Sequence, residues 1–246
     1  MAGIVTGRGH VTGQPGNGSF YGAGGSHCEP LDPLGPYAVA KVRAEEILRE
    51  SRRAGLHASI IRPKSFIGTG RLGVFQILFD WVEAGKRLPV LGDGENRYQL
   101  LEVTDLADAV WKITESDAEA TEYNVGATRF GTVNEDLTAL NRHAGTGGGL
   151  RHVPTGAAKQ ALRVLHRLHL SPLYPWVYET CDHDSAVDTR RIGAALGWTP
   201  RYSNAEMLCA TYDWYLAEGR HLARRKGTGH RAGWDQGVLK LLKAVS

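Results

Sequence analysis

Residues 36–63 read PYAVAKVRAEEILRESRRAGLHASIIRP, and this stretch decides the fold. Residues 36–55 place apolar or small side chains at helical spacing with charges between them, and Gly55 supplies a stop signal. Residues 57–63, HASIIRP, predict a buried strand that Pro63 ends. A helix that leads directly into a buried strand is typical of an α/β protein.

The alternation of helix and strand continues along the chain. Residues 74–87, VFQILFDWVEAGKR, predict an amphipathic helix, and residues 98–103, YQLLEV, predict a strand. Residues 104–116, TDLADAVWKITES, predict a helix that Thr104 caps, and residues 122–127, EYNVGA, predict another strand. Such regular alternation favours a mostly parallel sheet with helices on its faces.

Composition and charge set the class of protein. Apolar residues at 42% and charged residues at 22% are ordinary for a globular chain, and the formal charge of +3 indicates no nucleic-acid partner. Three scattered cysteines, Cys28, Cys181 and Cys209, predict neither a disulfide framework nor a metal site. No apolar stretch approaches the ~20 residues that cross a bilayer, and no signal peptide opens the chain. We therefore expect a cytoplasmic protein without a membrane partner.

The glycine-rich start, residues 3–13, reads GIVTGRGHVTG and is superficially similar to a dinucleotide-binding turn. Its glycines, Gly7, Gly9 and Gly13, do not have the spacing of such a turn. Pro15 and further glycines follow where a helix should begin, so the local sequence favours a flexible arm.

Tyr37 and Lys41 are four residues apart at the start of the first predicted helix, so they share one face. A phenol is a poor base at neutral pH, but a nearby ammonium favours the phenolate and lets the tyrosine exchange a proton with a hydroxyl or carbonyl. The same lysine could donate hydrogen bonds to a cofactor's ribose. Taken alone, the pair favours the simpler interpretation of a surface pair on a solvated helix.

Several motifs in order point to one family. They are FYGAGGSHCEPLDPLGPYAVAKVRAEEIL at 20–48, IIRPKSFIG at 60–68, LPVLGDGENRYQLLEVTDLADAV at 88–110 and AVDTRRIGAALGWTPRYSNAEML at 186–208. Together they resemble the extended short-chain dehydrogenases/reductases, the NAD-dependent epimerase/dehydratase family. The resemblance implies an incomplete Rossmann-type parallel sheet with a smaller, mainly helical C-terminal substrate lobe.

The resemblance also implies domains. Residues 1–22 would form the glycine-rich arm and 23–129 the remaining half of the dinucleotide-binding domain. Residues 68–100 would contribute to the substrate lobe, which 130–246 would complete. The site would lie between the two domains.

The roles implied for single residues centre on Tyr37 and Lys41. Tyr37 would transfer the proton, and Lys41 would lower the pKa of Tyr37 and hold the ribose of NAD or NADP. The turn of Arg62, Pro63, Lys64 and Ser65 would lie beside the nicotinamide. Hydride would pass between the cofactor and a hydroxyl or carbonyl carbon of a small-molecule substrate.

The sequence departs from the family pattern at the substrate side. Asn17 stands where many members have a serine or threonine four residues before the tyrosine corresponding to Tyr21, and Ser19 could replace it after a register shift. Tyr98 stands where sugar-nucleotide epimerases often have a diphosphate-binding arginine, with Arg97 one position early. Asn17, Tyr21, Arg97 and Tyr98 are the candidate substrate residues, and a sugar-nucleotide substrate is in doubt.

The glycines also stand too close to the catalytic pair. Only about two dozen residues separate Gly13 from Tyr37, too few for the strand-helix units that normally intervene. The chain therefore reads as the C-terminal two-thirds of such an enzyme, through a truncated gene model, a decaying gene or a fragment that needs a partner. We expect an open apolar sheet edge, weak cofactor binding, and association as a homodimer through the helix that carries Val42, Ile47 and Leu48.

Two other functions stay open. One is a non-catalytic binding or regulatory remnant of the same family. The other is a reductase of a sterol-like substrate, membrane-associated or not, for which residues 161–178, ALRVLHRLHLSPLYPWVY, would form a lid. Packing within the lobe is the simpler expectation for that segment.

Overall fold

The computed structural model describes residues 3–6, 10–13, 35–118, 120–168, 170 and 175–220, and of residues 3–6, 10–13, 35–38, 175 and 176 only the backbone. The helices and strands of the chain divide into two compact units, which are described separately. Unit 1 comprises 1–66, 99–129 and 185–203, and unit 2 comprises 67–98, 130–184 and 204–246.

Unit 1 contains a four-stranded sheet in the order β2-β1-β3-β7. Its strands are β1 (Gly3–Thr6), β2 (His10–Gly13), β3 (Ala58–Pro63) and β7 (Glu122–Val125). The β3–β7 pair is parallel, with Ile61 opposite Tyr123, whereas β1 runs antiparallel to both β2 and β3. The expectation of a flexible arm is therefore wrong for β1 and β2. We expected an open sheet edge, but β1 pairs with the edge of β3. This pairing satisfies the backbone polar groups along that edge of β3.

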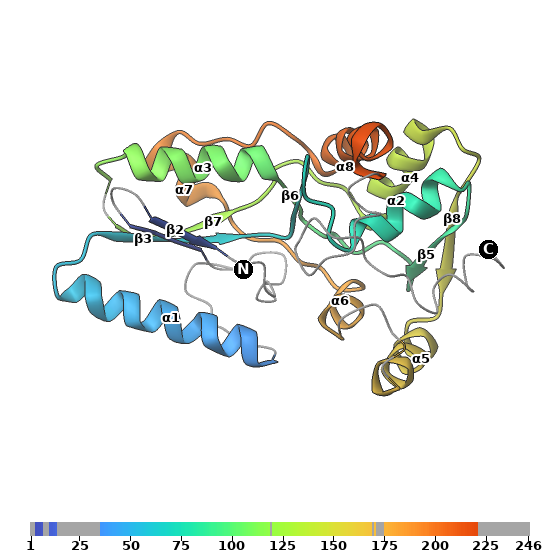
Figure 1. Ribbon diagram of the computed structural model, residues 1–246, viewed down its shortest axis with the longest axis horizontal. Coiled ribbons are helices and arrows are strands. Elements are labelled where there is room, and N and C mark those ends of the chain that lie inside the picture. The colour runs from blue at the N-terminus through green and yellow to red at the C-terminus, as the bar shows by residue number, and fades with distance from the viewer. Residues whose placement is uncertain are drawn as a thin grey trace. The chain divides into compact units, whose positions relative to one another are not determined.

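Helices cover both faces of this sheet (Figure 1). Helix α1 (Gly35–Arg53) lies on one face, and α3 (Val103–Glu115) and α7 (Arg190–Leu196) lie on the other. Alternate residues of β3 serve the two faces. Ile60 packs with Leu48 of α1, whereas Ile61 joins a cluster with residues of α3 and α7 and with Trp198. The hydrophobic run of β3 is thus explained by burial on both sides, as in parallel sheets.

The helix predicted at residues 104–116 begins one residue earlier than expected, and its cap differs. Glu102 is the N-cap residue of α3, and its carboxylate accepts hydrogen bonds from the backbone N–H of Thr104 at 2.5 Å and of Asp105 at 3.2 Å. The prediction of a Thr104 cap is wrong, since the Thr104 hydroxyl itself donates to Glu102. The strand predicted at 98–103 is correspondingly short, β6 (Leu101–Glu102).

Near its end, unit 1 is fixed by the turn LGWTP at residues 196–200, which lies within the family-like stretch at 186–208. Gly197 ends α7 at a φ of 60°, a left-handed conformation that glycine adopts without strain. Trp198 is 2% exposed and packs into the cluster with Ile61. Arg201 then donates from its backbone N–H and its Nε to the carboxylate of Asp105 on α3, each at 2.9 Å.

Unit 2 is mainly helical with one two-stranded parallel ribbon. Its elements are α2 (Phe75–Glu83), β5 (Leu88–Leu91), α4 (Val133–Ala144), β8 (Leu150–Val153), α5 (Thr155–Arg167), α6 (Pro175–Thr180), α8 (Asn204–Trp214) and the π-helix η1 (Tyr215–Gly219); β4 (Phe66–Ile67) stands at the change of unit. Strand β5 pairs with β8. Phe79, Tyr212 and Tyr215 pack as an aromatic group, and Trp81 of α2 is buried at 3% exposure.

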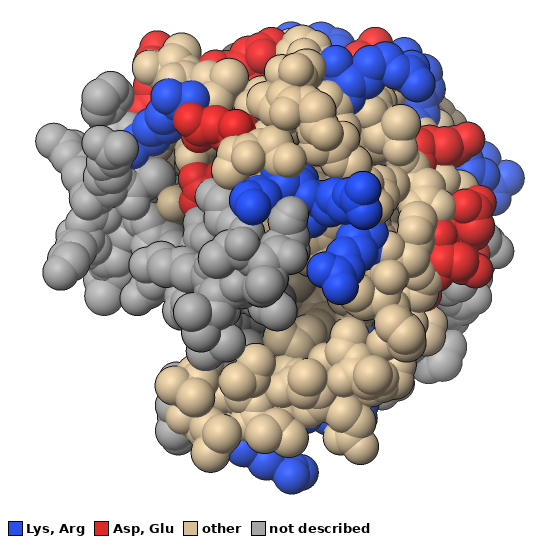
Figure 2. All heavy atoms as spheres, turned by 90° about the vertical axis from the view of Figure 1, so that its right-hand side faces the viewer, with Lys and Arg blue, Asp and Glu red and all other residues tan. Residues whose placement is uncertain are grey.

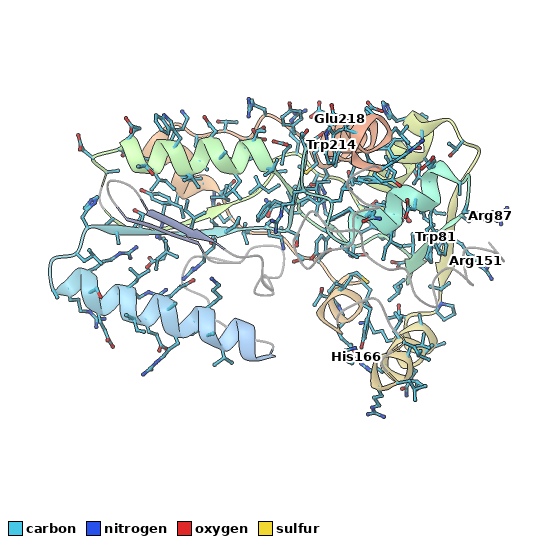
Figure 3. The ribbon with its side chains drawn as sticks, in the orientation of Figure 1. Trp81, Arg87, Arg151, His166, Trp214 and Glu218 are labelled. Atoms are coloured by element: carbon cyan, nitrogen blue, oxygen red, sulfur yellow. The ribbon has the colours of Figure 1, made fainter. Side chains whose placement is uncertain are left out.

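The surface of unit 2 is mixed in charge and partly apolar. Arg87 and Arg151 are exposed beside β5 and on β8 (Figure 3), and charges of both signs are interspersed over the visible described part of the face in Figure 2. Helix α5 has no buried residue, and Val164 and Leu168 are 51% and 59% exposed. The expected packing of this segment within the lobe is limited in α5, where Leu162 and Leu165 are half-buried and Arg163 donates to Glu179 of α6.

No helix among the described residues is long and apolar enough to span a membrane.

Candidate functional site

Helix α1 carries the predicted catalytic pair and is held against β3 by few side chains. Tyr37 and Lys41 lie one turn apart on α1. The Lys41 side chain is half-buried, whereas the Tyr37 side chain lies outside the described part of the structure. Among the α1 side chains at 39–53, only Glu45 and Leu48 are buried. Leu48 is therefore a core residue of unit 1, whereas Val42 is half-buried and Ile47 is 55% exposed. Pairing of two subunits through this helix stays a prediction.

An ion-pair network ties α1 to the sheet. Arg62 of β3 donates from Nε and Nη2 to the two carboxylate oxygens of Glu45 at 3.0 and 2.5 Å. The side chains of Arg62 and Glu45 are 10% and 5% exposed, so this is a buried, two-pronged contact. Arg62, predicted to lie beside the nicotinamide, thus has its guanidinium directed at α1.

The network extends to β7 through Glu122. Arg52 donates to the Glu122 carboxylate at 2.8 Å and Arg49 at 3.2 Å, while Arg49 also reaches Glu45 at 2.9 Å. Burial alone would raise the pKa of Glu122, but the hydrogen bond from Arg52 and the charges of Arg52, Arg49 and Arg62 lower it. The carboxylate therefore stays ionised and links α1 to the second strand of the parallel pair.

The turn after β3 lies at the carboxyl end of the parallel pair, where α/β sheets bind ligands. Pro63 ends β3, the Lys64 backbone N–H donates to Val125 O at 2.9 Å, and Ser65 O accepts from Leu101 N at 3.0 Å. Lys64 is 3% exposed, and its Nζ donates to Ser185 Oγ at 2.5 Å. Burial lowers the pKa of Lys64 from 10.5 to about 8.

Gln99 organises the neighbouring loop of unit 1. Its Nε2 donates to Ala127 O at 2.7 Å and its Oε1 accepts from Val187 N at 2.8 Å. The amide lies against Gly126, where an added Cβ would come within 2.6 Å of Gln99 Cδ. Sequence reasoning placed Lys64 in the turn beside the nicotinamide but missed its partner Ser185, and it missed Gln99. The glycine in the strand predicted at 122–127 was the one available signal of a close approach.

The two predicted substrate residues Arg97 and Tyr98 belong to unit 2. The Arg97 guanidinium lies 5.1 Å from the Phe130 ring centroid and donates to Phe130 O at 2.7 Å. Asn204 donates to Tyr98 O at 2.8 Å and to Asp136 at 2.7 Å. Both residues are thus set into a polar network of unit 2, at the start of α4 and α8.

The predicted residues therefore fall into three groups. Lys41, Arg62, Pro63 and Ser65 gather in unit 1 around α1 and the end of β3. Arg97 and Tyr98 stand in unit 2. The side chains of the remaining four predicted residues lie outside the described part of the structure; they are Asn17, Ser19, Tyr21 and Tyr37, of which only Tyr37 has a described backbone.

No group of three or more His, Cys, Asp or Glu side chains in the described ranges is placed to hold a metal ion.

Solved structures of other proteins share this fold. A solved structure of dTDP-glucose 4,6-dehydratase from Bacillus anthracis in complex with NAD is similar in fold, with a TM-score of 0.61 and 20% identity over 82% of this chain and 59% of that chain. The parallel strands and the helices on both faces define a Rossmann-like α/β protein.

A family model and several related sequences match the chain. Residues 12–126 match the model of the NAD dependent epimerase/dehydratase family. An uncharacterised protein of Sinorhizobium fredii is 40% identical over 86% of this chain and 53% of its own length. The UDP-glucose 4-epimerase of Mycolicibacterium smegmatis is 27% identical over 76% of this chain and 54% of its own length. Residues 12–126 thus carry the pattern of the NAD-dependent epimerase/dehydratase family, an extended short-chain dehydrogenase/reductase family, and the chain spans about half the length of the curated relatives it matches.

Proposed function

We propose that the chain contributes the catalytic helix and the substrate lobe of an NAD(P)-dependent oxidoreductase or epimerase/dehydratase that acts on a hydroxyl or carbonyl carbon. The observation that carries the proposal is the placement of Tyr37 and Lys41 one turn apart on α1, in a stretch that matches the family model. The site would use the carboxyl end of β3, where ligands of parallel sheets bind.

The residues that are present fit one half of the cofactor. Lys41 would hold the nicotinamide ribose, and the turn of Pro63 and Ser65 would lie beside the nicotinamide ring. Bound NAD(P) supplies the hydride chemistry. Gly3–Thr6 and His10–Gly13 form two antiparallel strands in place of a strand and a helix, which is not the arrangement of a pyrophosphate-binding turn. We therefore expect weak cofactor binding.

The chain's own residues would manage the proton. Tyr37 would give a proton to, or take one from, the substrate oxygen at its phenolic oxygen. The positive charge of Lys41 would favour the phenolate and so make the tyrosine a usable base at neutral pH. A nucleotide sugar is the substrate class favoured by the relatives, which include a UDP-glucose 4-epimerase and a dTDP-glucose 4,6-dehydratase. The departures at Asn17 and Tyr98 leave the particular sugar undefined.

The test is a titration of NADH and NADPH into the full chain, followed by cofactor fluorescence, with Lys41→Ala and the matched control Lys112→Ala on α3. Saturable binding that Lys41→Ala weakens and Lys112→Ala retains supports the proposal. Cofactor-dependent turnover that persists in Tyr37→Phe would contradict the assigned proton transfer. A folded chain that binds neither nucleotide would favour a non-catalytic module of the same family.

A further inference from the structure

Helix α1 is attached to its sheet in an unusual manner for a long helix. Of its side chains at 39–53, one apolar residue, Leu48, and one charged residue, Glu45, are buried. Leu48 packs with Ala58 and Ile60 of β3. Apolar contacts are non-directional, so a single leucine leaves a helix free to rotate and slide on the sheet. The direction of α1 must be set by something else.

Near the C-terminal end of α1, Arg52 makes directional hydrogen bonds to Ala58 O, Thr121 O and the Glu122 carboxylate. The directional contact nearest to the catalytic pair is the one between Glu45 and Arg62. Two parallel N–H···O bonds, at 3.0 and 2.5 Å, join a planar guanidinium to a planar carboxylate, and this geometry fixes both rotation and translation. Glu45 stands one turn after Lys41 and two turns after Tyr37, nearly on one face of the helix. Orienting Glu45 toward β3 therefore orients the catalytic pair.

We infer that Glu45 and Arg62 are positioning residues whose buried ion pair sets the rotation of α1 and thereby aims Lys41 and Tyr37 at the ligand site. This inference rests on the proposed function. Arg62 then acts on the cofactor through α1. The exposed pair Arg43–Glu46 on the same helix, at 3.1 Å with side chains 77% and 48% exposed, has no such role and provides the control.

The test separates positioning from stability. Removing one partner strands a buried charge and destabilises the fold, but replacing both partners by apolar residues of similar volume is often neutral or stabilising. The double variant Glu45→Leu with Arg62→Met should therefore unfold at a urea concentration similar to that of the wild type. It should still bind NADH about tenfold more weakly, because without the ion pair the helix no longer orients Lys41 toward the ligand site. The conservative variant Arg62→Lys should lie between the two, and Glu46→Gln should bind as the wild type does.

A second readout does not need the cofactor. Lys41 is half-buried, and its rate of modification by an acylating reagent, measured by mass spectrometry, reports how α1 is turned. We expect the double variant to change that rate several-fold while the rate for Lys112 stays constant. A wild type that binds no nicotinamide nucleotide would defeat the proposed function, and the Lys41 rate would then decide the inference alone. A stable double variant with wild-type Lys41 reactivity would overturn it.

Discussion

A single buried lysine gives unit 1 a distinctive pH dependence. Burial lowers the pKa of Lys64 from 10.5 to about 8, which corresponds to roughly 3 kcal/mol at about 1.4 kcal/mol per pKa unit. Between pH 8 and pH 10.5 the unfolded chain keeps the proton and the folded chain loses it. The free energy of unfolding therefore rises with pH across that window, and below pH 8 the folded state carries the full penalty of the buried charge.

Lys64→Met should remove this penalty. We expect the variant to be more stable than the wild type at pH 7 by about 1–2 kcal/mol, because the lost hydrogen bond to Ser185 offsets part of the gain. Urea unfolding at several values between pH 7 and pH 10.5 measures it, with Lys112→Met as control. An equal dependence on pH in wild type and Lys64→Met would contradict the assignment.

Gly126 stands at a position where the structure leaves no room for a side chain. An added methyl group would stand 2.6–2.8 Å from three atoms of the Gln99 amide, which is itself fixed by Ala127 and Val187. Gly126→Ala should therefore destabilise the chain by about 1–3 kcal/mol. Gly156→Ala, in α5 and in open space, should be neutral or stabilising by up to about 1 kcal/mol. Thermal unfolding of both variants decides between steric crowding and a general intolerance of alanine.

At the scale of the element, the start of α3 depends on a side chain that sequence rules do not favour as a cap. Glu102 accepts from Thr104 N and Asp105 N, and it is 7% exposed. Glu102→Ala should lower the free energy of unfolding by about 1–2 kcal/mol, and more than Thr104→Ala does. Urea unfolding of the two variants provides the comparison. If Thr104→Ala proved the more damaging, the cap would belong to the threonine after all.

The elements of unit 1 show what the sequence could and could not predict. The helix at 35–53 and the strand at 58–63 follow from apolar spacing, Gly55 and Pro63, and the structure confirms them. The cap of α3 was missed because glutamate reaches the helix amides only through a tertiary arrangement that buries it. The partners of Arg62 and Lys64 were missed for a similar reason, since Glu45 and Ser185 are 17 and 121 residues away in sequence.

Two strands show the limit of local propensity. Residues 1–22 are rich in glycine, and their composition predicts an arm. Gly3–Thr6 and His10–Gly13 within this segment form strands, because β1 pairs with the edge of β3 and β2 pairs with β1. The family motifs of residues 20–48 were recognisable in sequence. The geometry of Asn17, Ser19 and Tyr21 remains a prediction.

On the scale of the whole molecule, the chain crosses repeatedly between two units, each with its own buried core. A ligand stabilises the cooperative unit that binds it, by about 2.7 kcal/mol at a concentration of 100 times its dissociation constant. If the cofactor binds at α1 and β3, NADH should protect the backbone amides of unit 1 from hydrogen exchange by this amount. It should protect unit 2 less.

The cysteines of unit 2 make that difference measurable. Cys181 and Cys209 are half-buried, and burial raises the pKa of both thiols, to about 11 for Cys181, so labelling is slow until unit 2 opens. In a Cys28→Ser background, NADH should slow thiol labelling less than it slows amide exchange in β3 and β7. Lys41→Ala should abolish both effects. Equal protection of thiols and amides would mean that the two cores unfold as one cooperative body, because only then does a ligand of one core stabilise the other to the same extent.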